Sequence, residues 1–236
     1  MTRRSRVDST GRLGVLGGTF DPVHYGHLDA AAAARSALGL SDILFMPSHD
    51  PPHRRADPHA TAFHRFALVS LAINGLQGYR ASDEELRRQG SSYTADTLRA
   101  LHATGWSPSQ IFFILGADAF AEIASWREFP AVLDAANFAV IARPGTTIEA
   151  ALARTPELRP RVRRQVEGGA GTGATGVFLV EAATRDVSST MIRARLAARE
   201  SIDDLVPSAV ARHVTAHHLY GAEDGLHGDS EDKTGS

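Results

Sequence analysis

The sequence predicts an α/β protein with a doubly wound, mostly parallel sheet that carries helices on both faces. Short, continuous apolar runs alternate with helix-forming segments along the chain, as is typical of buried parallel strands joined by crossover helices. Glycine-, proline- and charge-rich turns follow most of the apolar runs. In such Rossmann-like folds, ligands bind beyond the carboxyl ends of the strands, so these turns predict one shared site.

The chain begins with a strand, a helix and a second strand. Leu13–Leu16 is an apolar run that ends in two glycines, and we expect the first strand there. His27–Leu38 is alanine-rich and Gly39 follows it, which predicts a helix with a glycine at its end. Ile43–Met46 is expected to be the second strand, ended by Pro47.

A loop and a helix follow. Ser48–Pro58 contains prolines and histidines and is expected to be a loop. Apolar periodicity predicts a helix over Phe63–Ile73. The apolar residues that this period places in the core are Phe63, Phe66 and Ile73.

The middle of the chain continues the alternation. Tyr79–Leu86 is a candidate strand, and Tyr93–Ala103 is expected to be a helix with Ser91 or Ser92 as its cap. The run IFFIL, Ile111–Leu115, predicts the clearest strand of the sheet.

The last part of the chain predicts two more strands. A helix over Trp126–Ala136 is expected to precede the strand Phe138–Ile141, and Val177–Val180 is expected to be the last strand. The glycine-rich run Gly168–Gly176 has no strand before it, so we interpret it as a flexible connector rather than a phosphate loop. The expected closing helices are Ser189–Arg199 and Pro207–Tyr220.

Composition limits the classes of function. The chain has 236 residues, a net charge of -2 and no cysteine. The absence of cysteine excludes disulfides and thiolate metal sites. The net charge shows no basic excess of the kind that binds nucleic acid. With no apolar run that could span a bilayer and no secretory signal, we expect a cytoplasmic protein without membrane or nucleic-acid partners. The only lysine is Lys233, so arginine and histidine carry the basic roles of the folded part. We expect one domain over 12–221, between dispensable disordered ends at 1–11 and 222–236.

The stretch GGTFDPVHYGH, from Gly17 to His27, is the richest in chemistry. Gly17 and Gly18 let the backbone approach an anion, and the helix that follows directs its N–H groups toward the same point. His24 and His27 are three residues apart, which places both rings on one side, and Gly26 leaves room between them. We interpret the stretch as a phosphate-binding turn.

Other interpretations of this stretch are weaker. A dinucleotide fingerprint would need G-x-G-x-x-G in register, which is absent. A metal site made of Asp21, His24 and His27 lacks a glutamate in zinc-protease spacing. Two unrelated surface histidines would require the whole string to be accidental.

Four further histidines receive no ligand role. His213 and His217 have metal-ligand spacing on a helix, but no third ligand is in view and we interpret them as a polar face. His64 and His102 are expected on exposed helix faces.

The motifs resemble those of a known family. GGTFDPVHYGH is similar to the signature of nucleotidyltransferases with an H-x-G-H motif, and VSSTMIR at 187–193 resembles their closing motif I-S-S-T-x-I-R. Other stretches resemble one family within that group, the bacterial nicotinate-nucleotide adenylyltransferases. They are PPHR at 51–54, SYTADTL at 92–98, GAD at 116–118, SW at 125–126, RPG at 143–145 and HLY at 218–220. The likeness covers about residues 13 to 220, so that 12–221 would be the nucleotidyltransferase domain.

This resemblance implies a reaction. ATP and nicotinate mononucleotide would give nicotinate adenine dinucleotide (deamido-NAD) and pyrophosphate, a step of NAD biosynthesis. The acceptor phosphate is already ionised, so an in-line attack needs positioning and charge stabilisation but no covalent intermediate. The implied cofactor is Mg²⁺, held mainly by the ATP phosphates rather than by a protein metal site. The partners would be ATP and nicotinate mononucleotide, and a homo-oligomer stays open.

The resemblance also assigns residues. The catalytic residues would be His24, His27 and Arg193. The residues that bind ATP would be Gly17, Gly18, Thr19, Phe20, Gly116, Asp118, Ser188, Ser189 and Thr190. The residues that bind the acceptor would be His53, Arg54, Tyr93, Thr94, Trp126 and Arg143. Trp126 would stack on the pyridine ring, and backbone N–H groups near Thr94 would receive its carboxylate. Local sequence alone fits Asp118 equally well as a helix cap, requires one of Ser188, Ser189 and Thr190 to cap a helix, and favours Trp126 as a core residue.

One departure and several alternatives remain. Arg54 stands where the family has lysine, which keeps the charge but changes its geometry. Related enzymes use nicotinamide mononucleotide, 4′-phosphopantetheine or a polyol phosphate as the acceptor, and a non-catalytic nucleotide sensor is possible on the same fold. A dehydrogenase lacks its glycine register. An aminoacyl-tRNA synthetase would need a lysine signature that Lys233 alone cannot supply.

Overall fold

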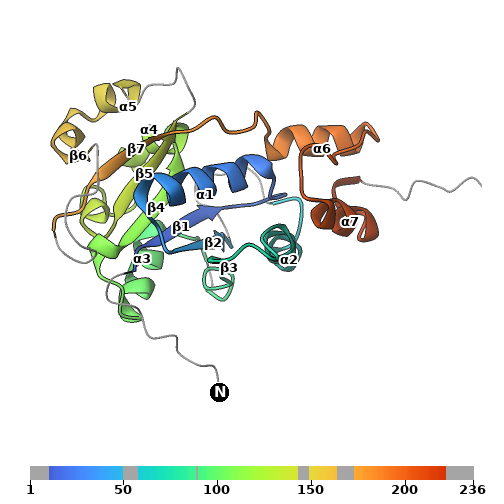
Figure 1. Ribbon diagram of the computed structural model, residues 1–236, viewed down its shortest axis with the longest axis horizontal. Helices are drawn as coiled ribbons and strands as arrows, with labels where there is room; N and C mark the ends of the chain where they lie inside the picture. Colours follow the sequence, from blue (N-terminus) through green and yellow to red (C-terminus); the bar gives the residue numbers. More distant parts are fainter. Residues whose placement is uncertain (1–10, 50–57, 89, 143–148, 164–172, 222–236) are drawn as a thin grey trace, which may run out of the picture.

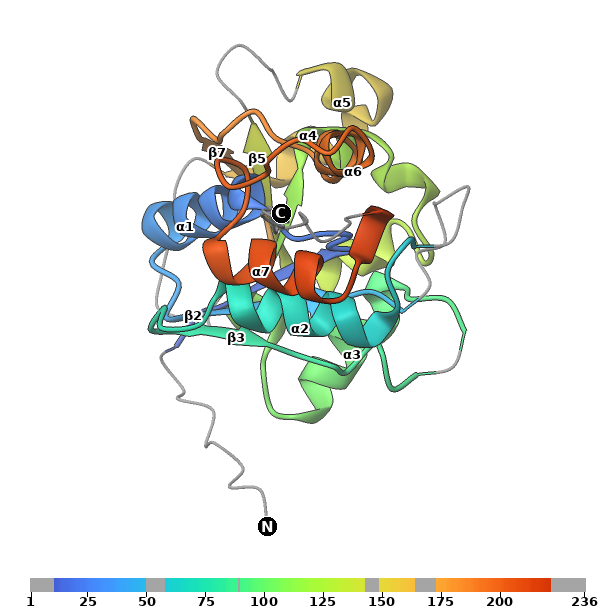
Figure 2. The ribbon, with the colours of Figure 1, turned by 90° about the vertical axis from the view of Figure 1, so that its right-hand side faces the viewer.

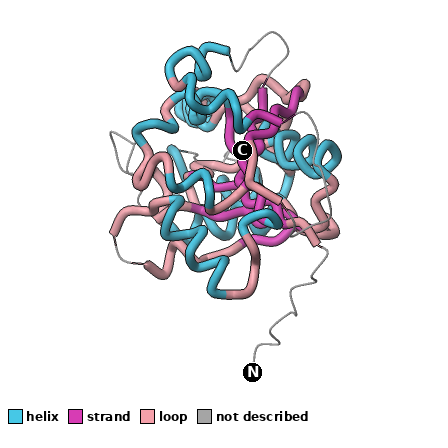
Figure 3. Tube along the Cα trace, turned by 90° about the vertical axis from the view of Figure 1, so that its left-hand side faces the viewer, coloured by secondary structure: helices cyan, strands magenta, loops and turns pink. Residues whose placement is uncertain are grey.

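The computed structural model describes residues 11–49, 58–88, 90–142, 149–163 and 173–221. In these ranges seven strands form one sheet in the order β3-β2-β1-β4-β5-β7-β6, and each neighbouring pair is parallel. The strands are β1 (Leu13–Gly18), β2 (Asp42–Pro47), β3 (Tyr79–Ala81), β4 (Ile111–Gly116), β5 (Asn137–Ala142), β6 (Val162–Arg163) and β7 (Val177–Glu181). Helices surround the sheet (Figure 3), which confirms the predicted doubly wound α/β fold.

The α-helices are α1 (Tyr25–Leu38), α2 (Ala62–Ala72), α3 (Thr94–Ala103), α4 (Ala117–Ala121), α5 (Glu149–Arg154), α6 (Ser189–Ala197) and α7 (Ser208–Ala216). The short 3₁₀ helices are η1 (Pro108–Gln110), η2 (Ile123–Ser125), η3 (Ala131–Asp134), η4 (Pro156–Arg161) and η5 (Leu219–Gly221). None of these described helices has both the length and the apolar composition that crossing a membrane requires.

Two hydrophobic layers cover the two faces of the sheet. On β4, Phe112 and Ile114 pack with α1, α2, α6 and α7, whereas Ile111, Phe113 and Leu115 pack with α3, α4 and η3. This alternation follows from the pleat of a strand, which sends successive side chains to opposite faces. Helices α2, α6 and α7 gather at one end of the molecule (Figure 1), and α7 lies along α2 (Figure 2).

The strand order places a crevice between β1 and β4. From β1 the chain proceeds outward to β2 and β3, and it then crosses back through α3 to β4 on the other side of β1. At such a reversal, the loops that leave two adjacent strands diverge to opposite faces and leave room for a ligand. GGTFDPVHYGH leaves β1 at this point, and the Gly116-Ala117-Asp118 turn leaves β4.

Most predicted elements are confirmed to within a few residues. The alanine-rich helix α1 ends at Gly39, which has the left-handed φ of 61° that favours glycine. The candidate strand over Tyr79–Leu86 is shorter than predicted, because β3 stops at Ala81. The two-residue strand β6 was not predicted, since a pair of residues carries no periodicity. The last predicted helix stops at Ala216 instead of Tyr220.

The predicted helix over Trp126–Ala136 is wrong. Turns occupy 126–130, and only η3 follows. Pro130 lies in the middle of that window and has no N–H to donate within a helix, which explains the break. The predicted serine cap of α3 is also wrong, because Tyr93 occupies the N-cap position and no side chain caps the helix.

The core face of α2 differs from the predicted one. Phe63 is 88% exposed, Phe66 is half-buried, and only Ile73 of the three predicted core residues is buried. The buried positions of the helix are Arg65, Leu68, Val69 and Ala72. They follow the helical period, but the face was missed because one member is an arginine.

Candidate active site

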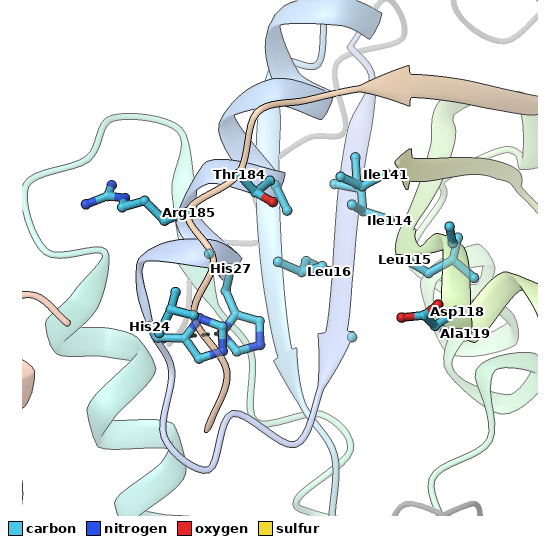
Figure 4. A pocket seen from close by; sticks show the side chains of 16 residues that line it. Leu16, His24, His27, Ile114, Leu115, Asp118, Ala119, Ile141, Thr184 and Arg185 are labelled. Carbon is cyan, nitrogen blue, oxygen red and sulfur yellow. Dashed lines mark hydrogen bonds between the residues drawn. The ribbon is translucent and has the colours of Figure 1, made fainter. Parts of the chain in front are cut away.

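A pocket of about 540 Å³ lies at the carboxyl ends of β1 and β4. Figure 4 shows the rings of His24 and His27 on one side of this pocket and Asp118 on the other. Its walls come from β1, α1, β4, α4, β5 and the segment that follows β7. They include Leu16, Gly17, His24, Gly26, His27, Ile114, Leu115, Gly116, Asp118, Ala119, Ile141, Thr184, Arg185 and Val187. We call it the nucleotide pocket.

His24 and His27 are held by the start of α1. His24 is the N-cap residue, and its backbone N–H donates to Nδ1 of His27 at 3.2 Å. A neutral His27 therefore carries its proton on Nε2, which makes that atom a donor. A Cβ at Gly26 would lie only 3.2 Å from the His24 ring and from Val187, so glycine does leave the room that the sequence suggested.

Burial keeps the two imidazoles neutral. Desolvation lowers the pKa of His24 from 6.5 to about 4, against a smaller opposing effect of Asp29. Desolvation, together with the nearby His24, lowers the pKa of His27 well below 6.5. Within the described residues, Nδ1 of His24 is buried and has no hydrogen-bond partner. A polyanion in this pocket would favour protonation of both rings.

Asp21 fixes the loop that precedes these histidines. Its carboxylate is fully buried and accepts hydrogen bonds from the backbone N–H groups of His59 (2.9 Å) and Ala60 (3.0 Å) and from the Tyr220 hydroxyl (2.9 Å). Burial raises the pKa of Asp21, but these hydrogen bonds outweigh it and hold the pKa below the usual 3.8. The Asp21 carbonyl accepts from Arg193 Nη1 at 2.7 Å. The loop at Asp21 is therefore hydrogen-bonded both to α6, through Arg193, and to Tyr220 near the end of the described chain.

Arg65 joins the loops that leave β1 and β2. Its guanidinium is 1% exposed and donates to the carbonyls of Thr19 (2.8 Å), Ser48 (2.7 Å), His49 (3.3 Å) and Ala60 (3.3 Å). Sequence reasoning did not single out Arg65. The available signal was a charged residue on the apolar face of a predicted helix.

A second pocket of about 260 Å³ adjoins the first. We call it the acceptor pocket. It is lined by Gly17, Gly18, Thr19, Ser48, Glu85, Ser92, Tyr93, Thr94, Phe113, Leu115, Ala119, Trp126 and Arg127. Gly17, Leu115 and Ala119 line both pockets, so the two cavities meet at the ends of β1 and β4.

Trp126 forms an aromatic wall of the acceptor pocket. Its ring packs edge-on against Phe113 (centroids 5.9 Å) and Phe138 (6.4 Å), and the residue is half-buried. The residue therefore packs partly in the core, as the local sequence suggested, and also lines the cavity. Across from it, the start of α3 carries Tyr93 and Thr94, and the Arg127 guanidinium lies 4.7 Å from the Tyr93 ring centroid.

The structure brings together most of the predicted site residues. Those that line one of the two pockets are Gly17, Gly18, Thr19, His24, His27, Tyr93, Thr94, Gly116, Asp118 and Trp126. Phe20 does not line either pocket, because its side chain is 2% exposed and packs edge-on under His27. His53, Arg54 and Arg143 lie outside the described residues, as does the first part of the glycine-rich connector.

The predicted residues at the start of α6 line neither pocket, whereas Val187, directly before them, lines the nucleotide pocket. Ser188 caps the helix by accepting the Met191 N–H at 3.1 Å, which confirms the capping interpretation. The Ser189 hydroxyl donates to the Pro22 carbonyl at 2.9 Å, and Thr190 accepts from Arg193 Nη2 at 3.2 Å. The Ser189 contact, together with that of Arg193 on the Asp21 carbonyl, fastens α6 to the loop that precedes His24.

Sequence reasoning gave no site role to several residues that line the pockets, among them Thr184, Arg185 and Val187 after β7 and Ser48, Glu85 and Ser92. Arg185 grips Asp29 of α1 with its backbone N–H (3.0 Å), Nε (3.0 Å) and Nη2 (2.9 Å). Its guanidinium also lies 3.8 Å from the Tyr25 ring centroid and points away from the pocket (Figure 4). These hydrogen bonds hold the segment after β7, which forms one wall of the nucleotide pocket, against α1.

The predicted positions of the other histidines on exposed helix faces are partly wrong. His64 is not on a free helix face, because its Nδ1 lies 3.1 Å from Nε2 of His213 and its ring lies 5.0 Å from that of His217. His102 lies between the carbonyls of Trp106 and Ala135, at 3.0 and 2.9 Å. Over the described part of the chain, no group of three histidine or carboxylate side chains is arranged to hold a metal ion.

Comparisons with known proteins agree with this geometry. A model of the cytidylyltransferase-like family matches residues 15–195. The chain is similar to a probable nicotinate-nucleotide adenylyltransferase of Symbiobacterium thermophilum, with 39% identity over 211 residues that span 89% of this chain and 95% of that protein. It is 38% identical over 214 residues to a protein of the same name from Trichlorobacter lovleyi, which covers 89% of this chain and 99% of that one.

A solved structure shows the same fold. The chain is similar to Plasmodium falciparum nicotinic acid mononucleotide adenylyltransferase complexed with NaAD, with a TM-score of 0.68 and 17% identity. The likeness covers 90% of this chain and 98% of that chain. At this identity it supports the fold alone.

Proposed function

The chain belongs to the nicotinate-nucleotide adenylyltransferase family, and we propose that it transfers the adenylyl group of ATP to nicotinate mononucleotide. The products are nicotinate adenine dinucleotide and pyrophosphate. The observation that carries the proposal is the shared wall of the two pockets at Gly17, Leu115 and Ala119. ATP in one cavity and the acceptor in the other would place the acceptor phosphate against the α-phosphorus, where an in-line attack needs it.

The nucleotide pocket supplies charge stabilisation. His24 and His27 would donate to the ATP phosphates, and they gain positive charge as negative charge accumulates beside them. The N–H groups at the start of α1 add the positive end of the helix dipole. Gly116 lies across the pocket beside open space, which lets the nucleotide approach the backbone, and Asp118 would accept from ribose hydroxyls.

Arg193 lies on α6 and is tied to the loop that precedes His24. Its Nη1 donates to the Asp21 carbonyl, and its Nη2 donates to Thr190. We propose that its guanidinium binds the outer phosphates of ATP, while Ser188 and Ser189 fix the first turn of α6 beside the loop. Arg54 and His53 complete the phosphate site in this proposal.

The acceptor pocket supports recognition of a pyridine ring that bears a carboxylate. Trp126 offers a flat face to the ring, and Tyr93 and Thr94 stand at the start of α3. Because no side chain caps that helix, its first N–H groups are free to receive the carboxylate. A carboxamide would form weaker hydrogen bonds with the same donors, since its oxygen carries no full charge.

Mg²⁺ is the cofactor in this proposal, and the triphosphate would supply most of its ligands. Among the described residues, Asp118 is the carboxylate that lines the nucleotide pocket. The ion would neutralise phosphate charge, while the residues of this chain hold the phosphates in position.

The testing experiment measures pyrophosphate release from ATP and Mg²⁺ with three acceptors in parallel. They are nicotinate mononucleotide, nicotinamide mononucleotide and 4′-phosphopantetheine. Faster release with nicotinate mononucleotide than with its amide is the expected result. Release with 4′-phosphopantetheine alone would contradict the roles of Trp126 and Thr94, and ATP binding without any release would favour a nucleotide sensor.

A further inference from the structure

Glu85 is a buried carboxyl group in the wall of the acceptor pocket. It is 6% exposed and lines the cavity beside Ser92, Tyr93 and Thr94. Nothing in the proposed reaction uses it as an acid or a base. Its position is notable because the substrate that this cavity would take carries a carboxylate of its own.

Two hydroxyl groups hold Glu85 beside the start of α3. The Thr97 hydroxyl donates to Oε1 of Glu85 at 2.5 Å, and the Ser92 side chain is also hydrogen-bonded to it. Oγ of Ser92 accepts the His49 backbone N–H at 2.9 Å, which leaves its own proton for Glu85. The carboxyl group is therefore held by Ser92, directly before Tyr93, and by Thr97, about one helical turn after Tyr93.

The positive charges near Glu85 offset the negative charge of its ionised form only in part. Arg88 is a cation whose charge lowers the pKa of Glu85, but its Nη2 is paired with Glu84 at 3.1 Å and its Nη1 donates to Thr97 at 3.3 Å. Arg127 lines the same pocket, yet it pairs with Asp96 at 3.3 Å. Burial raises the pKa of Glu85 above its usual 4.5, and Glu84 adds to the effect, while the two hydroxyls and Arg88 oppose it.

We propose that Glu85 is a specificity-determining residue, which takes up a proton from solvent when the pyridine carboxylate of nicotinate mononucleotide enters the pocket. The inference rests on the proposed function. An ionised Glu85 would repel the carboxylate but not a neutral carboxamide, so acid binding is coupled to one proton and amide binding is not. A protonated Glu85 keeps its hydrogen bonds and removes the like charge.

The test compares kcat/KM for nicotinate and nicotinamide mononucleotides from pH 6 to 9. Both substrates carry the same phosphate, so its titration cancels in the acid-to-amide ratio. We expect this ratio to fall as pH rises, with a limiting slope of about tenfold per pH unit above the pKa of Glu85. Glu85→Gln should flatten the profile, whereas Glu84→Gln, which removes a carboxylate that raises the pKa of Glu85, should keep the limiting slope and shift the profile toward lower pH.

A second measurement needs no variant. Calorimetric titration of nicotinate mononucleotide into the parent protein, in two buffers of different ionisation enthalpy, should show proton uptake that nicotinamide mononucleotide does not cause. An acid-to-amide ratio that does not change with pH in the parent would overturn the inference. So would a Glu85→Gln variant that changes kcat/KM for both substrates equally and keeps the parental pH profile, since Glu85 would then have only a structural role. Pyrophosphate release with neither substrate would instead overturn the proposed function itself.

Discussion

The imidazole rings of His24 and His27 face each other with centroids 3.7 Å apart and planes inclined by 30°. Two imidazolium ions at this separation would repel each other, and burial already lowers both pKa values. The pair is therefore neutral without a ligand and gains charge only when an anion is close. This arrangement suits a site in which negative charge increases during the reaction.

Replacement of His27 tests that role directly. His27→Ala should lower kcat by about 10²–10³-fold, the range seen when one donor to a developing charge is lost. The free energy of unfolding should change by less than about 2 kcal/mol, because the ring lies at a pocket wall. Steady-state kinetics and urea denaturation are the measurements. His217→Ala, at an exposed histidine, is the control, and parental turnover of His27→Ala would refute the assignment.

The stability of the ligand-free protein should depend on pH through His24. Its pKa is 6.5 when unfolded and about 4 when folded, so the unfolded chain binds the proton first. The contribution is fully present above pH 6.5 and is lost as pH falls toward 4, by up to about 3 kcal/mol.

Urea denaturation at pH 7.5 and 5 measures this loss. Burial and the neighbouring His217 and His64 also lower the pKa of His213, so the parent must be compared with His24→Gln. The variant should lose less stability on acidification, and ATP should reduce the loss in the parent. An equal loss in both proteins would assign the effect to other groups.

The contact between Asp21 and Tyr220 predicts a long-range effect on the site. Tyr220→Phe removes a hydroxyl that donates to the buried carboxylate at 2.9 Å. An incompletely satisfied buried acceptor costs about 1–3 kcal/mol. We expect that loss of unfolding free energy, together with a raised KM for ATP because the carboxylate fixes the His24 loop. Tyr79→Phe is a matched control, and a parental KM would restrict Tyr220 to a structural role.

The strands, helix ends and turns that depend on short sequence patterns were for the most part predicted correctly. IFFIL predicts β4 because a short, continuous apolar run rich in isoleucine and phenylalanine is typical of a buried parallel strand, and Gly39 marks the end of α1 by its left-handed φ. GGTFDPVHYGH identified the pocket because its glycines, helix start and histidines are close in the sequence and line the same cavity. Arg65, Glu85 and Arg185 were missed because their partners are distant in the chain or their burial follows from packing alone.

The exposed Phe63 gives a simple test of the corrected α2 face. Phe63→Ala should change the free energy of unfolding by no more than about 0.5 kcal/mol, because its side chain is 88% exposed. Leu68→Ala, five residues later on the same helix and fully buried, should cost about 2–5 kcal/mol. Urea denaturation of both variants measures the difference. A large loss for Phe63→Ala would restore the core position that its sequence period suggested.

The grip of Arg185 on Asp29 predicts opposite effects of two variants on His24. The Asp29 carboxylate raises the pKa of His24, but less than burial lowers it, and Arg185 neutralises that carboxylate through two side-chain hydrogen bonds. Arg185→Ala should therefore raise the pKa of His24, and Asp29→Asn should lower it further. Both variants weaken the same contact, so any loosening of the pocket wall should raise the KM for ATP in both.

An NMR titration of the His24 ring separates the two effects. Structural loosening alone would move the ring pKa of both variants in the same direction, toward the value of an exposed histidine. Opposite directions can arise only from the change in charge beside the ring, since one variant exposes a negative charge and the other deletes it. That result would assign Asp29 and Arg185 a tuning role in the charge response of the phosphate site, and a shared direction would reduce them to a structural latch.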